Sequence, residues 1–296
     1  MSNYKLFSDS SCDLPADYVK KYDIGIIPYS VSLGDEFYYK EIVELQPEDF
    51  YKKIAEKNSF PKTSLPSIQD YIDAFTPALK AGKDIICICL SAKFSGSFQS
   101  ALNAKQILLE SYPQNIEIID SRQATGGQGL LLYEMAQMQS AKYPFEKVVA
   151  EAKRLRDTAK INFTVESLEY LQKGGRIGKA GALAGNILNI KPIITMYHGE
   201  LSPVGKVRGF QKAVKMIIDM TQKEIGAEAE NYQLCVLSAQ NMERAIALKQ
   251  MLQQTTSFDI LELPFQVGVT IGAHAGPTAL GICYIKHACL KESMEP

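Results

Sequence analysis

Short apolar runs alternate with amphipathic segments along the first half of the chain. Three of these runs end in a turn rich in Ser or Gly, and each turn leads into a segment with helical periodicity. The paired runs and helices are residues 4–8 with 16–22, 84–90 with 98–108, and 116–120 with 130–141. Strand, turn and helix at this spacing predict βαβ units, a parallel sheet and right-handed crossovers. Ligands of such sheets bind beyond the carboxyl ends of the strands, so we expect Ser10, Ser95 and Gly126 along one edge.

The rest of the pattern predicts further elements. Residues 24–33 are expected to form a strand, in which Pro28 indicates an edge or a bulge, and the Pro-bracketed residues 59–67 are expected to form a loop. The other expected helices cover residues 46–57, 68–81, 145–160, 166–173, 180–188, 210–225 and 242–253, and the other expected strands cover 161–165, 191–196, 201–207, 232–238 and 259–264. Near the C-terminus, apolar runs on both sides of residues 272–277 predict two strands joined by a Gly-framed loop that holds His274.

The length of the chain favours two packed units. At 296 residues the chain is long for a single core. We place the boundary at the extended segment that begins near residue 161, which gives an N-terminal α/β domain over 1–160 and a C-terminal α/β domain over 161–296. The expected fold class is therefore α/β, with a parallel βαβ sheet in the first domain and a mixed sheet in the second, which would form much of a ligand pocket.

Composition narrows the classes of function. The chain is 46% hydrophobic and 22% charged with a formal net charge of −1, so no polybasic surface for nucleic acid is present. Four of the six cysteines lie in strand-like runs, and no Cys-x-x-Cys or Cys/His cluster has metal spacing, which favours buried thiols in a reducing cytosol. No signal-peptide pattern and no apolar run of about 18 residues occurs. We therefore expect a cytoplasmic protein without a metal.

The turn that joins residues 84–90 to the next helix is the most informative stretch. It contains Ser91, Ser95, Gly96 and Ser97. The first N–H groups of a helix have no partner within the helix, and the helix dipole places partial positive charge there. This turn therefore predicts an anion site for a phosphate, a sulfate or a carboxylate.

The known catalytic motifs are absent. A Ser nucleophile needs a nearby base, and His274 is the candidate because its loop is framed by Gly272 and by Gly276. However, residues 93–97 read Lys-Phe-Ser-Gly-Ser and do not match the Gly-x-Ser-x-Gly elbow of α/β-hydrolases. Neither the P-loop nor the dinucleotide-binding Gly motif occurs after a strand. A hydrolase stays possible without a specific motif, and an NAD or ATP enzyme is disfavoured.

Anion binding without turnover fits the available side chains better. Thr63, Ser95, Ser97 and His274 offer neutral donors, and Arg176 is the one cation in a Gly-framed loop. A carboxylate needs few donors, and each charge-assisted hydrogen bond contributes about 1.5–3 kcal/mol. A triphosphate would need more cations than this set contains.

Five ordered blocks of sequence resemble the DegV family of bacterial fatty-acid-binding proteins. The blocks are Ser8-Asp9-Ser10, Thr63-Ser64-x-Pro66-Ser67, the stretch from Leu90-Ser91 to Ser95-Gly96-Ser97-x-Gln99-Ser100-Ala101, the stretch from Glu166 to Ile177, and Gly272-x-His274-x-Gly276-Pro277. The resemblance covers nearly the whole chain and is specific because the blocks occur together and in order.

The resemblance implies a two-domain α/β lipid carrier with no catalytic residue and no cofactor. Its ligand would be a long-chain fatty acid such as palmitate, or another chain of about C14 to C18. By resemblance, Thr63, Ser95 and His274 hydrogen-bond the carboxylate, while Gly96, Ser97 and Arg176 support the anion site. Members of the family resemble the binding subunit of a bacterial fatty acid kinase, so the implied partner is a separate ATP-dependent kinase subunit that makes an acyl-phosphate for phospholipid synthesis. Transient contact with a membrane is also implied.

The chain departs from the family pattern near the site, and other functions stay open. Lys93 and Phe94 replace small or aliphatic residues, Ser97 replaces Thr, and Thr278 replaces a common Gly. These changes leave the carboxylate donors intact and affect the finer shape of the site. The alternatives are an esterase or acyl-phosphate hydrolase that uses Ser95 and His274, and a regulatory module that senses a carboxylate ligand.

Overall fold

The first half of the chain forms the predicted parallel sheet. A computed structural model describes residues 3–34, 36–57, 60–183 and 189–289. The sheet has the strand order β2-β1-β6-β7, and all its pairs are parallel. Its strands are β1 (Tyr4–Asp9), β2 (Gly25–Ile27), β6 (Asp84–Cys89) and β7 (Ile116–Asp120). The three predicted strand and helix pairs are thus confirmed, and their turns meet at the carboxyl edge of the sheet.

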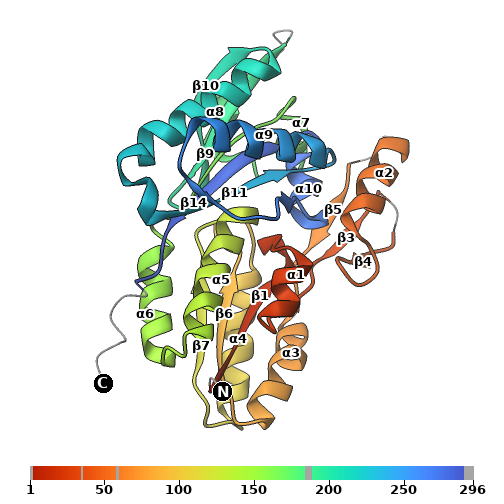
Figure 1. Cartoon of the computed structure of the whole chain (residues 1–296). Helices are drawn as coiled ribbons and strands as arrows, with labels where there is room; N and C mark the ends of the chain where they lie inside the picture. The colour runs from red at the N-terminus through yellow and green to blue at the C-terminus, as the bar shows by residue number, and fades with distance from the viewer. Residues whose placement is uncertain (1–2, 35, 58–59, 184–188, 290–296) are drawn as a thin grey trace.

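Helices cover both faces of this sheet (Figure 1). They are α3 (Ile68–Lys80) and α4 (Ser97–Leu109) on one face, and α5 (Thr125–Ser140) and α6 (Phe145–Leu155) on the other. Side chains of β6 alternate between the two faces, so that Cys87 packs with α3 and α4 while Ile86 packs with α5. The helix α1 (Ala16–Lys21) follows β1 after the short 3₁₀ turn η1 (Ser10–Cys12).

A small antiparallel sheet stands beside the parallel one. It has the order β4-β3-β5, with β3 (Ser30–Ser32), β4 (Tyr39–Lys40) and β5 (Lys62–Ser64), and α2 (Pro47–Lys57) lies between β4 and β5 in the chain. The single strand predicted over residues 24–33 is wrong, because the chain breaks at Pro28 and Tyr29 and its two halves enter different sheets. The loop predicted over 59–67 contains β5, which pairs with β3 across a long sequence separation.

The second half forms a mixed sheet, as predicted. Its order is β10-β9-β8-β14-β11-β12, with β13 also paired to β11. The strands are β8 (Lys160–Thr164), β9 (Ile190–Tyr197), β10 (Glu200–Arg208), β11 (Tyr232–Ser238), β12 (Asp259–Ile260), β13 (Phe265–Gln266) and β14 (Leu280–Lys286). The helices α8 (Phe210–Ile225) and α9 (Met242–Thr255) pack on one face, and the 3₁₀ turn η3 (Gly226–Asn231) leads from α8 into β11. The other face packs against α5, so the two halves share one continuous core.

Three helix predictions need correction. The glycines at 126, 127 and 129 lie inside α5, where the sequence predicted a turn, because their lack of a side chain lets α5 approach the mixed sheet. A Cβ at Gly126 would lie 2.9 Å from the sulfur atoms of both Cys235 and Cys283. The helix predicted over 145–160 ends at Leu155. The helix predicted over 180–188 is a 3₁₀ turn, η2 (Gly178–Leu183), and residues 184–188 lie outside the described residues.

The apolar run before His274 also differs from its prediction. The sequence predicted a strand followed by a loop, whereas residues Val269–Ala275 form the helix α10, with His274 in its last turn. The run is buried on most sides, which hides the helical period from a reading of apolar positions. The short helix α7 (Glu169–Lys173) packs against α10 and begins later than the predicted residue 166.

Candidate functional site

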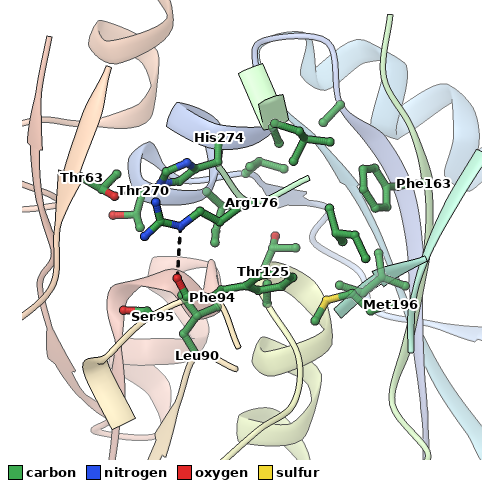
Figure 2. A pocket seen from close by; sticks show the side chains of 18 of the residues that line it. Thr63, Leu90, Phe94, Ser95, Thr125, Phe163, Arg176, Met196, Thr270 and His274 are labelled. Carbon is green, nitrogen blue, oxygen red and sulfur yellow. Dashed lines mark hydrogen bonds between the residues drawn. The ribbon is translucent and has the colours of Figure 1, made fainter. Parts of the chain in front are cut away.

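An apolar cavity lies between the parallel sheet and the mixed sheet. Its space, counted together with the open solvent at its mouth, amounts to about 900 Å³. Its apolar lining comes from both halves of the chain: Leu65, Leu90, Phe94, Ala124, Ile161, Phe163, Leu171, Met196, Leu201, Leu237, Val267, Ile271, Ala275 and Ala279. In Figure 2, Thr63, Ser95, Thr270 and His274 lie on the side opposite Phe163 and Met196, and Thr125 lies between the two groups.

Thr63 and His274 meet at the polar end of this cavity. The Oγ1 atom of Thr63 lies 2.9 Å from the Nε2 atom of His274. Thr63 is placed by β5, where it pairs with Val31 of β3, and His274 is placed by α10. Residues 211 positions apart in the sequence are therefore joined by one hydrogen bond, which links the small sheet to the second half of the chain.

His274 is a neutral imidazole at physiological pH. Burial, together with the smaller effect of the positive charge of Arg176, lowers its pKa to about 4. Its Nδ1 atom is buried and has no hydrogen-bond partner among the described residues. That nitrogen faces Gly174, where a Cβ would lie only 2.2 Å from it, so the absence of a side chain at Gly174 makes room for the ring. A neutral ring protonated at Nε2 can donate a hydrogen bond to Thr63 or to an anion at the polar end without carrying a charge of its own.

Ser95 presents a hydroxyl at the same end of the cavity. It lies in the turn between β6 and α4 and lines the cavity. Its Oγ atom accepts hydrogen bonds from the Tyr29 hydroxyl at 2.8 Å and from the Ser97 N–H at 3.2 Å. Because both bonds use Oγ as the acceptor, the proton of Ser95 is free to point toward a ligand.

Gly96 and Ser97 do not line the cavity. Gly96 precedes the first residue of α4, and Ser97 is fully buried. The hydroxyl of Ser97 donates to the Asp9 carboxylate at 2.7 Å and lies 2.6 Å from the hydroxyl of Tyr71. The sequence predicted an anion at this turn, and the structure places one of the chain's own carboxylates there. Ser97 affects the cavity only indirectly, because its N–H donates a hydrogen bond to Ser95.

Asp9 is fully supplied with donors. Its carboxylate accepts hydrogen bonds from Ser11 Oγ, Gln128 Nε2, Ser97 Oγ and the Leu90 N–H. Burial raises the pKa of Asp9, and these hydrogen bonds oppose that rise. The site is complete without a ligand.

Arg176 lies at the rim of the cavity and is exposed. Its Nε donates to the Phe94 carbonyl at 3.2 Å (Figure 2), and its Nη1 donates to the Gly174 carbonyl at 2.8 Å. These backbone contacts hold the guanidinium beside the polar end. Phe94, one of the departures from the family pattern, also lines the cavity.

Several lining residues were missed by the sequence analysis. Tyr29 supports Ser95, and Thr270 lines the cavity one helical turn before His274. Thr125 also lines the cavity, with φ of 46° and a buried hydroxyl that has no partner among the described residues. A Tyr directly after Pro28 was the one available signal, because it indicates a chain break where a side chain can turn inward. Nothing local marks Thr270 or Thr125.

The geometry does not assemble a hydrolase. Ser95 and His274 line the same cavity, yet in the described part of the chain Ser95 pairs with Tyr29, and His274 pairs with Thr63. The Nδ1 atom of His274, which an acid would orient in a Ser-His-acid triad, has no partner there. Within the described residues no group of three or more His, Cys, Asp or Glu side chains could hold a metal ion. None of the described helices has the length and apolar character that crossing a bilayer requires.

Comparison with known proteins gives consistent matches along the whole chain. A sequence model of the DegV family, described as uncharacterised, matches residues 3–287. A DegV domain-containing protein of Clostridium acetobutylicum is 34% identical over 287 residues, which cover 97% of this chain and 99% of the relative. A stearic-acid-binding protein from Eubacterium ventriosum has a TM-score of 0.91 at 34% identity and covers 96% of this chain and 98% of its own. A fatty-acid-binding DegV family protein from Thermus thermophilus has a TM-score of 0.87 at 28% identity, with 96% and 99% covered.

Proposed function

Since the chain belongs to the DegV family, we propose that it binds a long-chain fatty acid in the cavity between its two sheets. The carboxylate accepts hydrogen bonds from Thr63, Ser95 and His274, and the acyl chain lies along the apolar walls. The observation that carries this proposal is the convergence of three neutral polar side chains at one end of an otherwise apolar cavity.

The energetics agree with such a ligand. Burial of a C16 chain at about 0.8 kcal/mol per CH₂ contributes about 12 kcal/mol before the costs of binding are subtracted. The polar end then needs only to satisfy a single negative charge, which three neutral donors can do. Solved relatives support the ligand class, because the Eubacterium ventriosum protein is a stearic-acid-binding protein and the Thermus thermophilus protein binds fatty acid.

The protein presents this carboxylate to a separate ATP-dependent kinase subunit, which forms an acyl-phosphate for phospholipid synthesis in the cytoplasm. The support lies in the rim, where exposed Arg176 stands beside the carboxylate end and within reach of a second protein. The carrier itself performs no turnover. Transient contact with a membrane would load the cavity.

Mass spectrometry tests the ligand directly. The purified protein is denatured and extracted, and we expect a stoichiometric fatty acid of about C14 to C18. The variant Thr63→Val keeps the volume of the side chain and removes the hydroxyl, so it should retain less ligand. An empty wild-type cavity together with ester hydrolysis that Ser95→Ala abolishes would overturn the carrier in favour of the hydrolase.

A coupled assay tests the kinase role. Acyl-phosphate should form only when the loaded protein, ATP and a kinase subunit are all present, and Arg176→Ala should slow its formation while leaving the bound fatty acid in place. Acyl-phosphate formation by the protein and ATP alone would contradict the proposal.

A further inference from the structure

The buried carboxylate of Glu41 connects the segments that support Ser95 and His274. Glu41 follows β4 in the first half of the chain and is 1% exposed. Its Oε2 atom accepts hydrogen bonds from the hydroxyls of Ser10 and Thr270, both at 2.6 Å, and its Oε1 atom accepts from the Thr270 N–H at 3.1 Å. Glu41 thus joins the turn after β1 to the first turn of α10.

The carboxylate of Glu41 fixes the start of α10. The first N–H groups of a helix lack intrahelical partners, and the Thr270 N–H is satisfied by Glu41. The fit is close, because a Cβ at Gly268 would lie 2.6 Å from the Oε1 atom of Glu41 and 2.5 Å from the Oδ1 atom of Asp13. The approach of α10 to Glu41 therefore requires glycine at position 268.

The position of α10 determines the position of His274. Thr270 and His274 are four residues apart in the helix, so they lie on one face, and both line the cavity. In Figure 2 both side chains are seen at the polar side of the cavity. A shift of the first turn of α10 would move the imidazole relative to Thr63, which it contacts at 2.9 Å.

The same network reaches Ser95 from the other side. The Glu41 N–H donates to the Tyr29 carbonyl at 2.9 Å, and the Tyr29 N–H donates to Ser10 Oγ at 3.0 Å. The hydroxyl of Tyr29 then donates to Ser95 at 2.8 Å. Glu41 is thus the point where the supports of Ser95 and of His274 meet.

We propose that Glu41 is a positioning residue, which sets the spacing of the carboxylate donors through Thr270 on one side and through Tyr29 on the other. This inference rests on the proposed fatty-acid function. It predicts an effect on ligands with a carboxylate and little effect on ligands held only by the apolar walls.

The test uses two probes of equal chain length, myristic acid and 1-tetradecanol, titrated calorimetrically into delipidated full-length protein. Glu41→Gln should weaken the affinity for myristic acid about tenfold and the affinity for 1-tetradecanol less than about twofold, because one acceptor of the network is lost and the walls are unchanged. Glu134→Gln is the matched control, because Glu134 is 2% exposed and accepts the Ala288 N–H away from the cavity. The control should bind both probes as the wild type does.

A second pair of variants covers the case in which Glu41→Gln fails to fold. Thr270→Val removes the side-chain donor to Glu41 and should weaken myristic acid about fivefold, while Thr270→Ser restores the donor and should recover most of the affinity.

Equal weakening of both probes, or unchanged myristic acid affinity in Glu41→Gln and Thr270→Val, would overturn the positioning role. Failure of the wild type to bind myristic acid would overturn the proposed function instead, so the two failures are distinguishable.

Discussion

Two polar sites flank the turn between β6 and α4, and they differ in where their anion comes from. On the sheet side, the Asp9 carboxylate accepts four hydrogen bonds, one of them from Ser97. On the cavity side, Ser95, Thr63 and His274 offer donors at the end of an apolar space. Positions two residues apart in one turn thus serve an internal anion and, by our proposal, a ligand's anion. In our proposal the cavity keeps polar hydrogens for a ligand, whereas the Asp9 site uses its donors within the protein.

The largest expected effect comes from the internal site. Asp9→Ala should lower the free energy of unfolding by about 3–5 kcal/mol, because it leaves buried donors without an acceptor. Ser95→Ala, in the same turn, should cost less than about 1 kcal/mol. Urea denaturation of both variants measures the contrast, and equal losses of stability would remove the distinction between the sites.

The binding site should show the reverse behaviour. Each of Thr63→Val, Ser95→Ala and His274→Ala should weaken fatty-acid affinity by about 1.5–3 kcal/mol, the contribution of a charge-assisted hydrogen bond. Calorimetric titration of delipidated protein with stearic acid gives these values. If all three variants bind as tightly as the wild type, the anchor lies elsewhere in the cavity.

The pKa of His274 reports whether a ligand carboxylate lies beside its ring. The empty protein should show a His274 pKa of about 4, since burial disfavours the imidazolium. A nearby ligand carboxylate should raise that pKa by about 1, equivalent to about 1.4 kcal/mol. Nitrogen-15 NMR of the ring, followed against pH with and without stearic acid, reports the change. A downward shift on binding would argue against a carboxylate beside the ring.

The lowered pKa of His274 also predicts how the stability of the empty protein changes in acid. A histidine whose pKa is lower in the folded than in the unfolded protein loses stability as pH falls through the unfolded value of about 6.5 toward the folded value. Bound fatty acid should raise the folded pKa of His274 and so shorten the pH range over which stability is lost, from its acid end. His274→Gln should remove this part of the pH dependence.

The smallest effect is expected at Asp13, close to Glu41. Burial, with the negative charge of Glu41, raises the pKa of Asp13 well above its usual value. Since a raised carboxyl pKa disfavours the folded state as pH rises through it, Asp13→Asn should stabilise the protein at pH 8 by up to about 1 kcal/mol and have little effect at pH 4. Its φ of 50° suits Asn.

Thermal unfolding at the two pH values measures this effect of Asp13→Asn. Asp219→Asn, on the exposed face of α8, is the control and should change little at either pH. Destabilisation at pH 8 would show that the Asp13 carboxylate is satisfied in the folded protein.

Local patterns in the sequence encode the main elements of the fold. Alternating apolar runs and helices specified the parallel sheet, because strand and helix periods are properties of neighbouring residues. The order of five short blocks was enough to identify the family. It also named Thr63, Ser95 and His274, which the structure brings to one cavity.

The way these side chains are held depends on contacts between distant segments of the folded chain. The strand β5 exists because β3 supplies its partner, and α10 is a helix although its apolar residues suggested a strand. Ser97 donates a hydrogen bond to Asp9 and is not part of the cavity wall. Hydrogen bonds between distant segments support the site through Tyr29, Glu41 and Thr270. Such bonds depend on which segments meet in the folded chain, and no local period records that meeting.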